Sequence, residues 1–340
     1  MTYLRVLDCG PASSVQDAGR FGYRRYGVST AGAMDHISLS LANALVGNAP
    51  HEAAVELVLS GGRFELQGGA ALCAVAGGGA ELLIDGRPVA PLHSACAYEG
   101  SILQVRSPNR GVFAYLSFSG AVKSPCVMGS RATHRRTGLG GAPLQPGDRL
   151  PLDDGEAFTG EFAPLRLRQP QAPARQPSGN EIRILPGPQL DAFPPDALSA
   201  LDGAEFTIDA LSDRMAYRLR GAAPIRRCST ELVSDGVTPG SLQIPGDGTV
   251  LVLMRDCQTT GGYPKIANVI SADLHHLAQI PPGQRVRLRQ VTHARAVSAA
   301  RGLKVWMNSL KHGIDPALTE PDVKVLLGCN LISGVTDGKS

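Results

Sequence analysis

The feature that most restricts the fold of this chain is a weak internal repeat. The segment LQPGDRLPL at 144–152 aligns with IPPGQRVRL at 280–288 at an offset of 136 residues. Each segment follows a loop that leaves a strongly apolar run, 112–119 in one case and 250–255 in the other, at an offset of 138. Because self-similarity at a fixed spacing indicates repeated structural units, we expect two related halves.

The apolar runs of both halves have the character of β-strands. They are short, rich in Val, Leu and Ile, and bounded by Gly, Pro and Asp. The chain has 40 glycines and 25 prolines among 340 residues, which favours turn-rich β structure. Helices are predicted only at 33–46, at 271–279, and at 293–311 after Thr292. The expected fold class is therefore mainly β with a few short helices.

The length of 340 residues exceeds that of a typical single domain. A segment rich in Pro and Gln and without aromatic residues separates the halves and is typical of a linker. We expect a first β domain at 1–165, a Pro-rich linker at 166–180 and a second β domain at 181–300. An extension at 301–340 is predicted to pack on the second domain.

The charge and the cysteine content of the chain restrict its expected binding partners and its expected cellular compartment. The chain has 33 basic and 30 acidic residues, so no strong overall field favours nucleic acid or an anionic membrane. Seven scattered cysteines without a CxxC pair fit a reducing compartment. The N-terminus lacks a signal-peptide pattern, and no run approaches about 18 apolar residues. We expect a cytoplasmic protein with no nucleic-acid or membrane partner.

Lys265 ends the motif RDCQTTGGYPK at 255–265, in a chain where arginine supplies 27 of the 33 cationic side chains. A lysine in such a loop suggests a task for a compact amine, such as neutralising a phosphate or carboxylate oxygen. Gly261 and Gly262 would let a ligand approach the backbone. The alternative, a solvated lysine in a wide strand connection, stays open.

Two further clusters combine charge with turns. The segment VQDAGRFGYRRYGVSTAGAMD at 15–35 carries Asp17, Arg20 and Tyr23 among glycines, a combination typical of functional loops. The alternative is a structural set of turns with surface ion pairs. In LSDRMAYRLRG at 211–221, Asp213 and Arg214 form either a weak strand-edge ion pair or, in a cleft, a bidentate clamp for an oxyanion.

Four segments, in order, resemble the biotin-dependent carboxyltransferase family. They are QDAGRFGYRRYGVSTAGAMD, SDRMAYRLRG, LVSDGVTPGSLQIPGDG and RDCQTTGGYPKIANVISADL. The resemblance is strongest to the branch that contains the C subunits of 5-oxoprolinase, also called KipA-like or allophanate hydrolase subunit 2-like. It implies two cyclophilin-like β-barrel domains in tandem, in agreement with the internal repeat.

The resemblance also implies a function and partners. A KipI-like (B-type) subunit and this chain would use ATP, with Mg²⁺, to activate 5-oxoproline, and an A-type subunit would complete hydrolysis to glutamate. Whether the nucleotide contacts this chain or the KipI-like subunit stays open. No Met-Lys-Met biotin attachment site is present, so we expect no covalent biotin. Two alternatives remain: a carboxyltransferase half that acts on urea or a related amide with an external biotin carrier, and a non-catalytic regulator that binds a KipI-like kinase inhibitor.

Activation of a lactam by phosphorylation requires cations around the transferred phosphoryl group. The candidate catalytic residues are Lys265, Arg214, Arg20 and Asp17, the last to orient an arginine or help hold magnesium; no resident metal site is expected. The candidate substrate-binding residues are Gln258, Thr260, Gly261, Gly262, Tyr263, Tyr23 and Asp213. Asp235 stands where the family pattern has a glutamate, and its shorter carboxylate changes the reach of that side chain.

Overall fold

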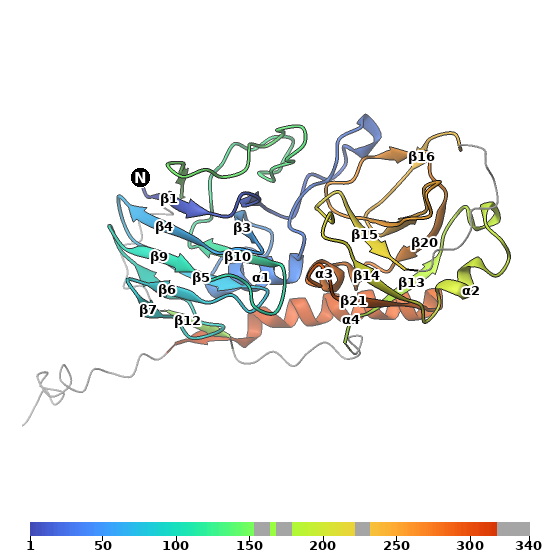
Figure 1. Ribbon diagram of the computed structural model, residues 1–340. Helices are drawn as coiled ribbons and strands as arrows, with labels where there is room; N and C mark the ends of the chain where they lie inside the picture. Colours follow the sequence, from blue (N-terminus) through green and yellow to red (C-terminus); the bar gives the residue numbers. More distant parts are fainter. Residues whose placement is uncertain (153–163, 168–178, 222–231, 318–340) are drawn as a thin grey trace, which may run out of the picture.

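The computed structural model describes residues 1–152, 164–167, 179–221 and 232–317 of the chain. These residues form two β-rich halves that lie side by side, the first from residues 1–152 and the second from 179–290 (Figure 1). The predicted mainly β fold class with few helices is confirmed. No helix in the described ranges is long and apolar enough to cross a membrane.

The first half consists of two antiparallel sheets that share one apolar core. Strand β4 shows why: its sequence GRFELQ buries alternate side chains, including Phe64 and Leu66. One sheet has the order β11 (Arg149–Pro151), β1 (Tyr3–Cys9), β4 (Gly62–Gln67), β9 (Ile102–Val105), β6 (Leu82–Ile84) and β7 (Arg87–Pro88). The other has the order β2 (Ser14–Gln16), β3 (Ala54–Val58), β10 (Phe113–Phe118), β5 (Ala71–Ala76) and β8 (Ala95–Ala97).

The second half is a closed barrel of seven strands. In β21, RVRLRQ buries Val286 and Leu288 while the intervening arginines face outward. The order is β13 (Glu181–Pro186), β20 (Lys265–Val269), β17 (Ser241–Gln243), β18 (Val250–Leu253), β15 (Ala216–Arg220), β14 (Glu205–Ile208) and β21 (Arg285–Gln290). A two-stranded ribbon of β16 (Asp235–Gly236) and β19 (Thr260–Gly261) stands beside it.

Helices lie mainly at the junction of the halves. The helices predicted at 33–46, 271–279 and 293–311 are confirmed as α1 (His36–Leu45), α3 (Leu274–Ala278) and α4 (His293–Leu310). Asp35 caps α1 by accepting from the backbone amides of its first turn. The structure adds α2 (Ala197–Leu201) and the 3-10 turns η1 (Arg24–Tyr26), η2 (Leu190–Ala192) and η3 (Lys311–Gly313).

The internal repeat corresponds to a shared turn and strand. Gly147 and Gly283 both have positive φ, 96° and 84°, just before β11 and β21, a conformation that favours glycine. The pairing then differs, because β11 runs antiparallel to β1 whereas β21 runs parallel to β13. The two halves therefore share this unit without sharing the whole strand order.

The C-terminal helix α4 joins both halves rather than only the second. It runs along both halves (Figure 1) and contacts α1 as well as β13. Leu303 and Trp306 share an apolar cluster with Ile37 of α1. Beyond it, β22 (Ile314–Pro316) pairs with β12 (Leu165–Leu167). Most of the predicted linker at 166–180, and residues 318–340 of the predicted extension, lie outside the described residues.

Candidate functional site

The loop between β2 and α1 of the first half reaches across to the second half (Figure 1). Nη2 of Arg24 donates to the carbonyl oxygens of Val237 at 2.6 Å and Gln258 at 2.9 Å. Oγ of Ser29 donates to the carbonyl oxygen of Cys257 at 2.6 Å. The motif RDCQTTGGYPK therefore begins in the contact between the halves and ends at the mouth of the barrel.

Arg214 is buried in that contact, with 5% of its surface exposed. Its Nε and Nη2 bind both carboxylate oxygens of Asp256 at 3.0 and 2.8 Å. Nη1 donates to Glu56 of the first half at 2.5 Å, and Nη2 also donates to the carbonyl oxygen of Gly32 at 2.7 Å. Burial by itself would lower the pKa of Arg214. The negative charges of Glu56 and Asp256 outweigh this effect and raise the pKa of Arg214 above its ordinary value.

Glu56 extends this network into the first half. Its Oε2 accepts from the hydroxyl of Tyr115 at 2.7 Å and from the backbone amide of Met34 at 3.0 Å. The hydroxyl of Tyr115 in turn accepts from the backbone amide of Asp35 at 2.8 Å. A buried charge is tolerated where its hydrogen-bonding capacity is used. Arg214 thus links the two halves through buried charge, and Asp213 does not pair with it but accepts from the amides of Met215 and Ala216.

Asp17 and Arg20 organise the loops of the first half. Asp17 accepts from the amide of Gly19 at 2.7 Å, from the hydroxyl of Ser130 at 2.7 Å and from the amide of Arg131 at 2.6 Å. Arg20 is fully buried and donates to the carbonyl oxygens of Val127 and Ala132 at 3.1 and 2.7 Å. Both residues tie the N-terminal loop to residues 124–134.

Lys265 lies at the start of β20, with 3% of its surface exposed. Its Nζ donates to Oδ2 of Asp235 and to the carbonyl oxygen of Gly236, both at 2.6 Å. The side chain of Asp235 is 58% exposed and also accepts from Nε2 of Gln189 at 2.9 Å. The bond from Lys265, assisted by that from the Gly236 amide, lowers the pKa of Asp235 below its usual range.

Amide side chains surround this lysine. Gln189 accepts from the backbone amide of Lys265 at 3.0 Å, and Nε2 of Gln243 donates to the carbonyl oxygen of Tyr263 at 2.9 Å. A Cβ atom on Gly261 would come within 3.1 Å of Nε2 of Gln243. An ammonium group has three N–H donors, and the described residues supply acceptors for two of those on Lys265. A third N–H donor and several amide groups therefore lie together at this end of the barrel.

The remaining candidate residues are distributed along the same loops. Gln258, Thr260 and Tyr263 are exposed, whereas Gly261 and Gly262 are half-buried. Tyr23 is half-buried at the start of η1. Lys265 shares no hydrogen-bond acceptor with Arg20 or Arg214 among the described residues. Their grouping into one ring of catalytic cations stays a prediction, and both guanidinium groups already have acceptors inside the chain.

Several residues that organise the site were not singled out from sequence. They are Glu56, Asp256, Gln189 and Gln243. Asp256 lies within the RDCQTTGGYPK motif, so its position next to a candidate loop was a usable signal. Glu56 sits in the apolar strand AVELV and gave no such signal, because only its partner 158 residues away explains its burial.

Residues 26–290 match the family model of the carboxyltransferase domain, subdomain A and B. The chain belongs to the carboxyltransferase A/B family. This carboxyltransferase-family chain is 36% identical over 312 residues to the C subunit of the 5-oxoprolinase of Escherichia coli K12, covering 90% of this chain and 97% of that protein. It is 34% identical over 315 residues to the corresponding C subunit of Haemophilus influenzae, covering 91% and 98%.

A solved structure also supports the family fold. The urea carboxylase of Kluyveromyces lactis is 26% identical, with a TM-score of 0.78. The match covers 94% of the carboxyltransferase-family chain and 31% of the urea carboxylase chain. The resemblance predicted from the four sequence segments is therefore confirmed, and the matched range of the family model includes Arg214, Asp235 and Lys265 but begins after Asp17 and Arg20.

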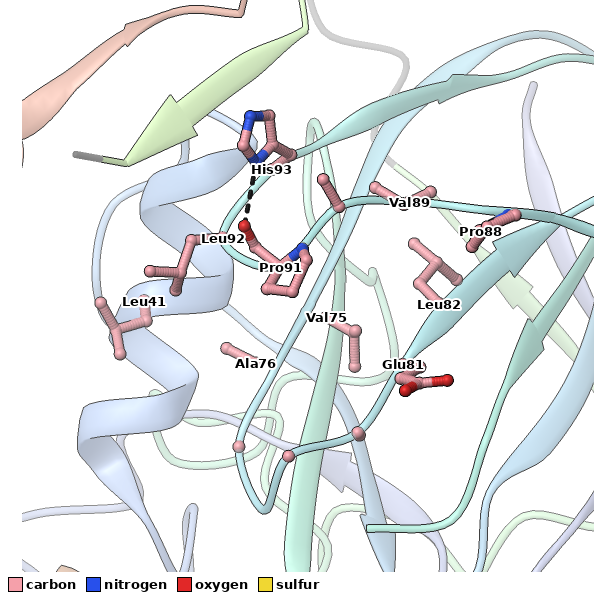
Figure 2. A pocket seen from close by; sticks show the side chains of 14 residues that line it. Leu41, Val75, Ala76, Glu81, Leu82, Pro88, Val89, Pro91, Leu92 and His93 are labelled. Atoms are coloured by element: carbon pink, nitrogen blue, oxygen red, sulfur yellow. Dashed lines mark hydrogen bonds between the residues drawn. The ribbon is translucent and has the colours of Figure 1, made fainter. Parts of the chain in front are cut away.

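The carboxyltransferase-family chain also has an apolar cavity of about 590 Å³ in its first half. Its wall includes Leu41 of α1 and Leu82 of β6, with His93 and Glu81 at its edge (Figure 2). None of the predicted site residues lines this cavity. Among the described residues no group of three or more His, Cys, Asp or Glu side chains is arranged to hold a metal ion.

Proposed function

We propose that this chain is the C subunit of a heteromeric, ATP-dependent 5-oxoprolinase. With a KipI-like subunit it activates 5-oxoproline, and a third, A-type subunit completes hydrolysis to glutamate. The observation that carries the proposal is the 36% identity to the C subunit of the Escherichia coli 5-oxoprolinase over 97% of that protein. The match covers 90% of this chain and 97% of that subunit, so it is not confined to a shared module.

The mouth of the second barrel suits a small amide. A lactam has a carbonyl oxygen that accepts and an N–H that donates, and Gln189, Gln243 and Gln258 carry amide groups able to pair with both. The backbone amides of Gly261 and Gly262 add donors for an oxyanion. These residues would orient the ring of the substrate.

Lys265 supplies the positive charge. Its third N–H donor would bind an oxygen of the phosphoryl group that is transferred from ATP, where negative charge is concentrated during activation. The lactam oxygen would attack this phosphoryl group, ADP would leave, and the phosphorylated oxygen would then be a good leaving group. At about 4 Å a unit charge pair is worth roughly 4 kcal/mol at an effective dielectric near 20. Asp235 offsets part of this attraction, and it also holds the amine in place.

Arg214, Asp17 and Arg20 would act as positioning residues. Their bonds fix the loops that carry Arg24 and the segment 256–258, so the mouth of the barrel has one defined shape. In this role their own side chains do not contact the substrate.

Exposed aromatic side chains support contact with a partner. Phe21 and Tyr26, close to Arg24 in the sequence, are 64% and 66% exposed, and Tyr263, close to Lys265, is 45% exposed. Aromatic residues are enriched at protein interfaces. The relatives are named as subunits, and we propose that these exposed aromatic side chains contact the KipI-like subunit.

Reconstitution tests the proposal directly. The chain is purified together with its KipI-like and A-type companions, and glutamate release from 5-oxoproline is measured with and without ATP. We expect turnover that requires all three chains and ATP. An intact complex, verified by size-exclusion chromatography, that shows no ATP-dependent glutamate release would refute the assignment.

A second candidate function rests on the match to urea carboxylase. The same barrel mouth would then bind urea or a related amide, and an external biotin carrier would bring the carboxyl group. Incubation of the chain with a carboxylated biotin carrier and urea tests this function. Carboxyl transfer to urea, combined with absent glutamate release, would favour it over the first proposal.

A further inference from the structure

Arg255 begins the motif RDCQTTGGYPK but takes no part in the site described above. No carboxylate of the described residues lies within salt-bridge distance of its guanidinium. Its Nε is buried without a hydrogen-bond partner, and its Nη2 faces Nδ1 of His36 at 3.5 Å. Burial lowers the pKa of Arg255, as expected of a cation without a close counter-ion.

Two imidazoles lie beside this guanidinium. His36 opens α1 of the first half and His275 lies on α3 of the second half. Their ring centroids are 5.6 Å apart, with the rings nearly perpendicular. Nδ1 of His275 is buried and has no hydrogen-bond partner in the described structure. Three groups that can carry positive charge thus converge between α1 of the first half and α3 of the second half.

The nearby carboxylates are already engaged. Asp35 accepts from the amides of Ile37 and Ser38, from the hydroxyl of Ser38 and from Nε2 of Gln279. Asp256, next to Arg255 in the chain, holds Arg214 in a bidentate pair. Neither carboxylate is left to satisfy the free donors of Arg255 and His275.

We propose that Arg255, His36 and His275 form a binding site for a small oxyanion, a carboxylate or phosphate group, at the junction of α1 and α3. One ligand oxygen would accept from Nε of Arg255 and another from the imidazole of His275. Hydrogen bonds to charged groups are the strong ones, and two unmade bonds on buried atoms are costly. The site does not include Lys265, so its test is independent of the proposed reaction.

The site should bind its ligand more tightly at lower pH. Burial first, and then Arg255, lowers the pKa of His36 to about 4, and burial also lowers that of His275. A bound anion favours the protonated imidazoles, so it raises both pKa values, and protonation in turn strengthens binding. Other charged or titratable groups that act on these three side chains are Asp35, Asp273, His276, Arg214, Tyr115 and Cys257.

Inorganic sulfate is the probe, because its charge is constant between pH 5 and 8. Sulfate is titrated into the full chain while the imidazole resonances of His36 and His275 are followed by NMR. We expect saturable shifts of both, with affinity increasing as pH falls. In Arg255→Gln binding should weaken about tenfold, the effect of losing a hydrogen bond to a charged group. Arg106→Gln, which removes a surface arginine paired with Glu81, is the control and should bind as the wild type does.

A second variant, His275→Gln, should also weaken sulfate binding. Thermal denaturation checks that each variant is folded. Acetate in place of sulfate at pH 7 distinguishes the sources: tighter sulfate binding indicates a phosphate-type ligand and tighter acetate binding a carboxylate. The proposal is overturned if neither anion shifts the two imidazoles, or if folded Arg255→Gln and His275→Gln bind both anions with wild-type affinity.

Discussion

Two buried cations of the second half, Arg214 and Lys265, differ in the carboxylates that they bind. Arg214 lies between Glu56 and Asp256, which are themselves buried. Lys265 binds Asp235, whose side chain is 58% exposed. The two cations are equally withdrawn from water, but only the second has a partner that water and ligands can reach.

This difference separates a structural cation from one that is available to a ligand. A charge whose partners are all buried must stay paired, because removing one member leaves uncompensated charge inside the protein. A charge bound to an exposed carboxylate can exchange that partner, because the carboxylate is solvated when it is released. Arg214 therefore holds the halves together, and Lys265 is the stronger candidate for catalysis.

The largest expected effect is on stability, in Arg214→Met. The substitution leaves Glu56 and Asp256 buried without a cation, and breaking such a pair costs about 3–5 kcal/mol. Urea denaturation at pH 7 measures the free energy of unfolding. Arg106→Met removes an exposed ion pair instead, which is worth about 0–1 kcal/mol. Equal losses in the two variants would show that Arg214 is not a structural cation.

Lys265→Met should act on turnover more than on stability. Loss of one group that stabilises developing charge lowers turnover by about 100- to 1,000-fold, measured as glutamate release by the complex with the KipI-like and A-type subunits. The free energy of unfolding should fall less than in Arg214→Met, because the freed Asp235 is exposed. Lys304→Met, on the exposed surface of α4, is the matched control. Unchanged turnover in Lys265→Met would remove the proposed catalytic role.

Local features of this chain were predictable from sequence because they depend on short-range rules. The spacing of Ile37, Leu41 and Leu45 predicted α1, and Gly47, which follows it, has a φ of 78°. Thr292 was expected to begin α4, and its Oγ1 accepts from the backbone amide of Arg295. The aligned segments 144–152 and 280–288 likewise predicted a common unit, and both contain a turn glycine with positive φ just before a strand.

The partners of the buried charges were not predictable in the same way. Arg214 binds Glu56 from 158 residues away, and no local pattern specifies that pairing. By alternation Glu56 would be an exposed strand residue, yet β3 is buried along most of its length. The sequence suggested that Arg214 makes a bidentate contact, but it indicated a bound ligand as the partner. The carboxylates of Glu56 and Asp256 that bind Arg214 come together only in the folded chain. The same holds for Asp235, whose contact with Lys265 depends on the β16–β19 ribbon.

The smallest effect, and the most direct test of the comparison, is on the titration of Asp235. The pKa of Asp235 is lowered first by the bond from Lys265 and then by the bond from the amide of Gly236. The ionised carboxylate therefore stabilises the folded chain at a pH above the pKa of Asp235 in the unfolded chain. This stabilisation is lost as the pH falls through the lower pKa of Asp235 in the folded chain. In Lys265→Met the pKa of Asp235, followed by NMR of its side-chain carboxyl carbon, should rise but stay below its usual range because the Gly236 bond remains. Asp209, whose pKa is lowered by the amide of Leu211 and by Arg220, serves as the internal control and should not change. An equal pKa of Asp235 in the wild type and in Lys265→Met would show that this carboxylate does not bind the amine of Lys265. Lys265 would then lack the exposed, exchangeable partner that distinguishes it from Arg214.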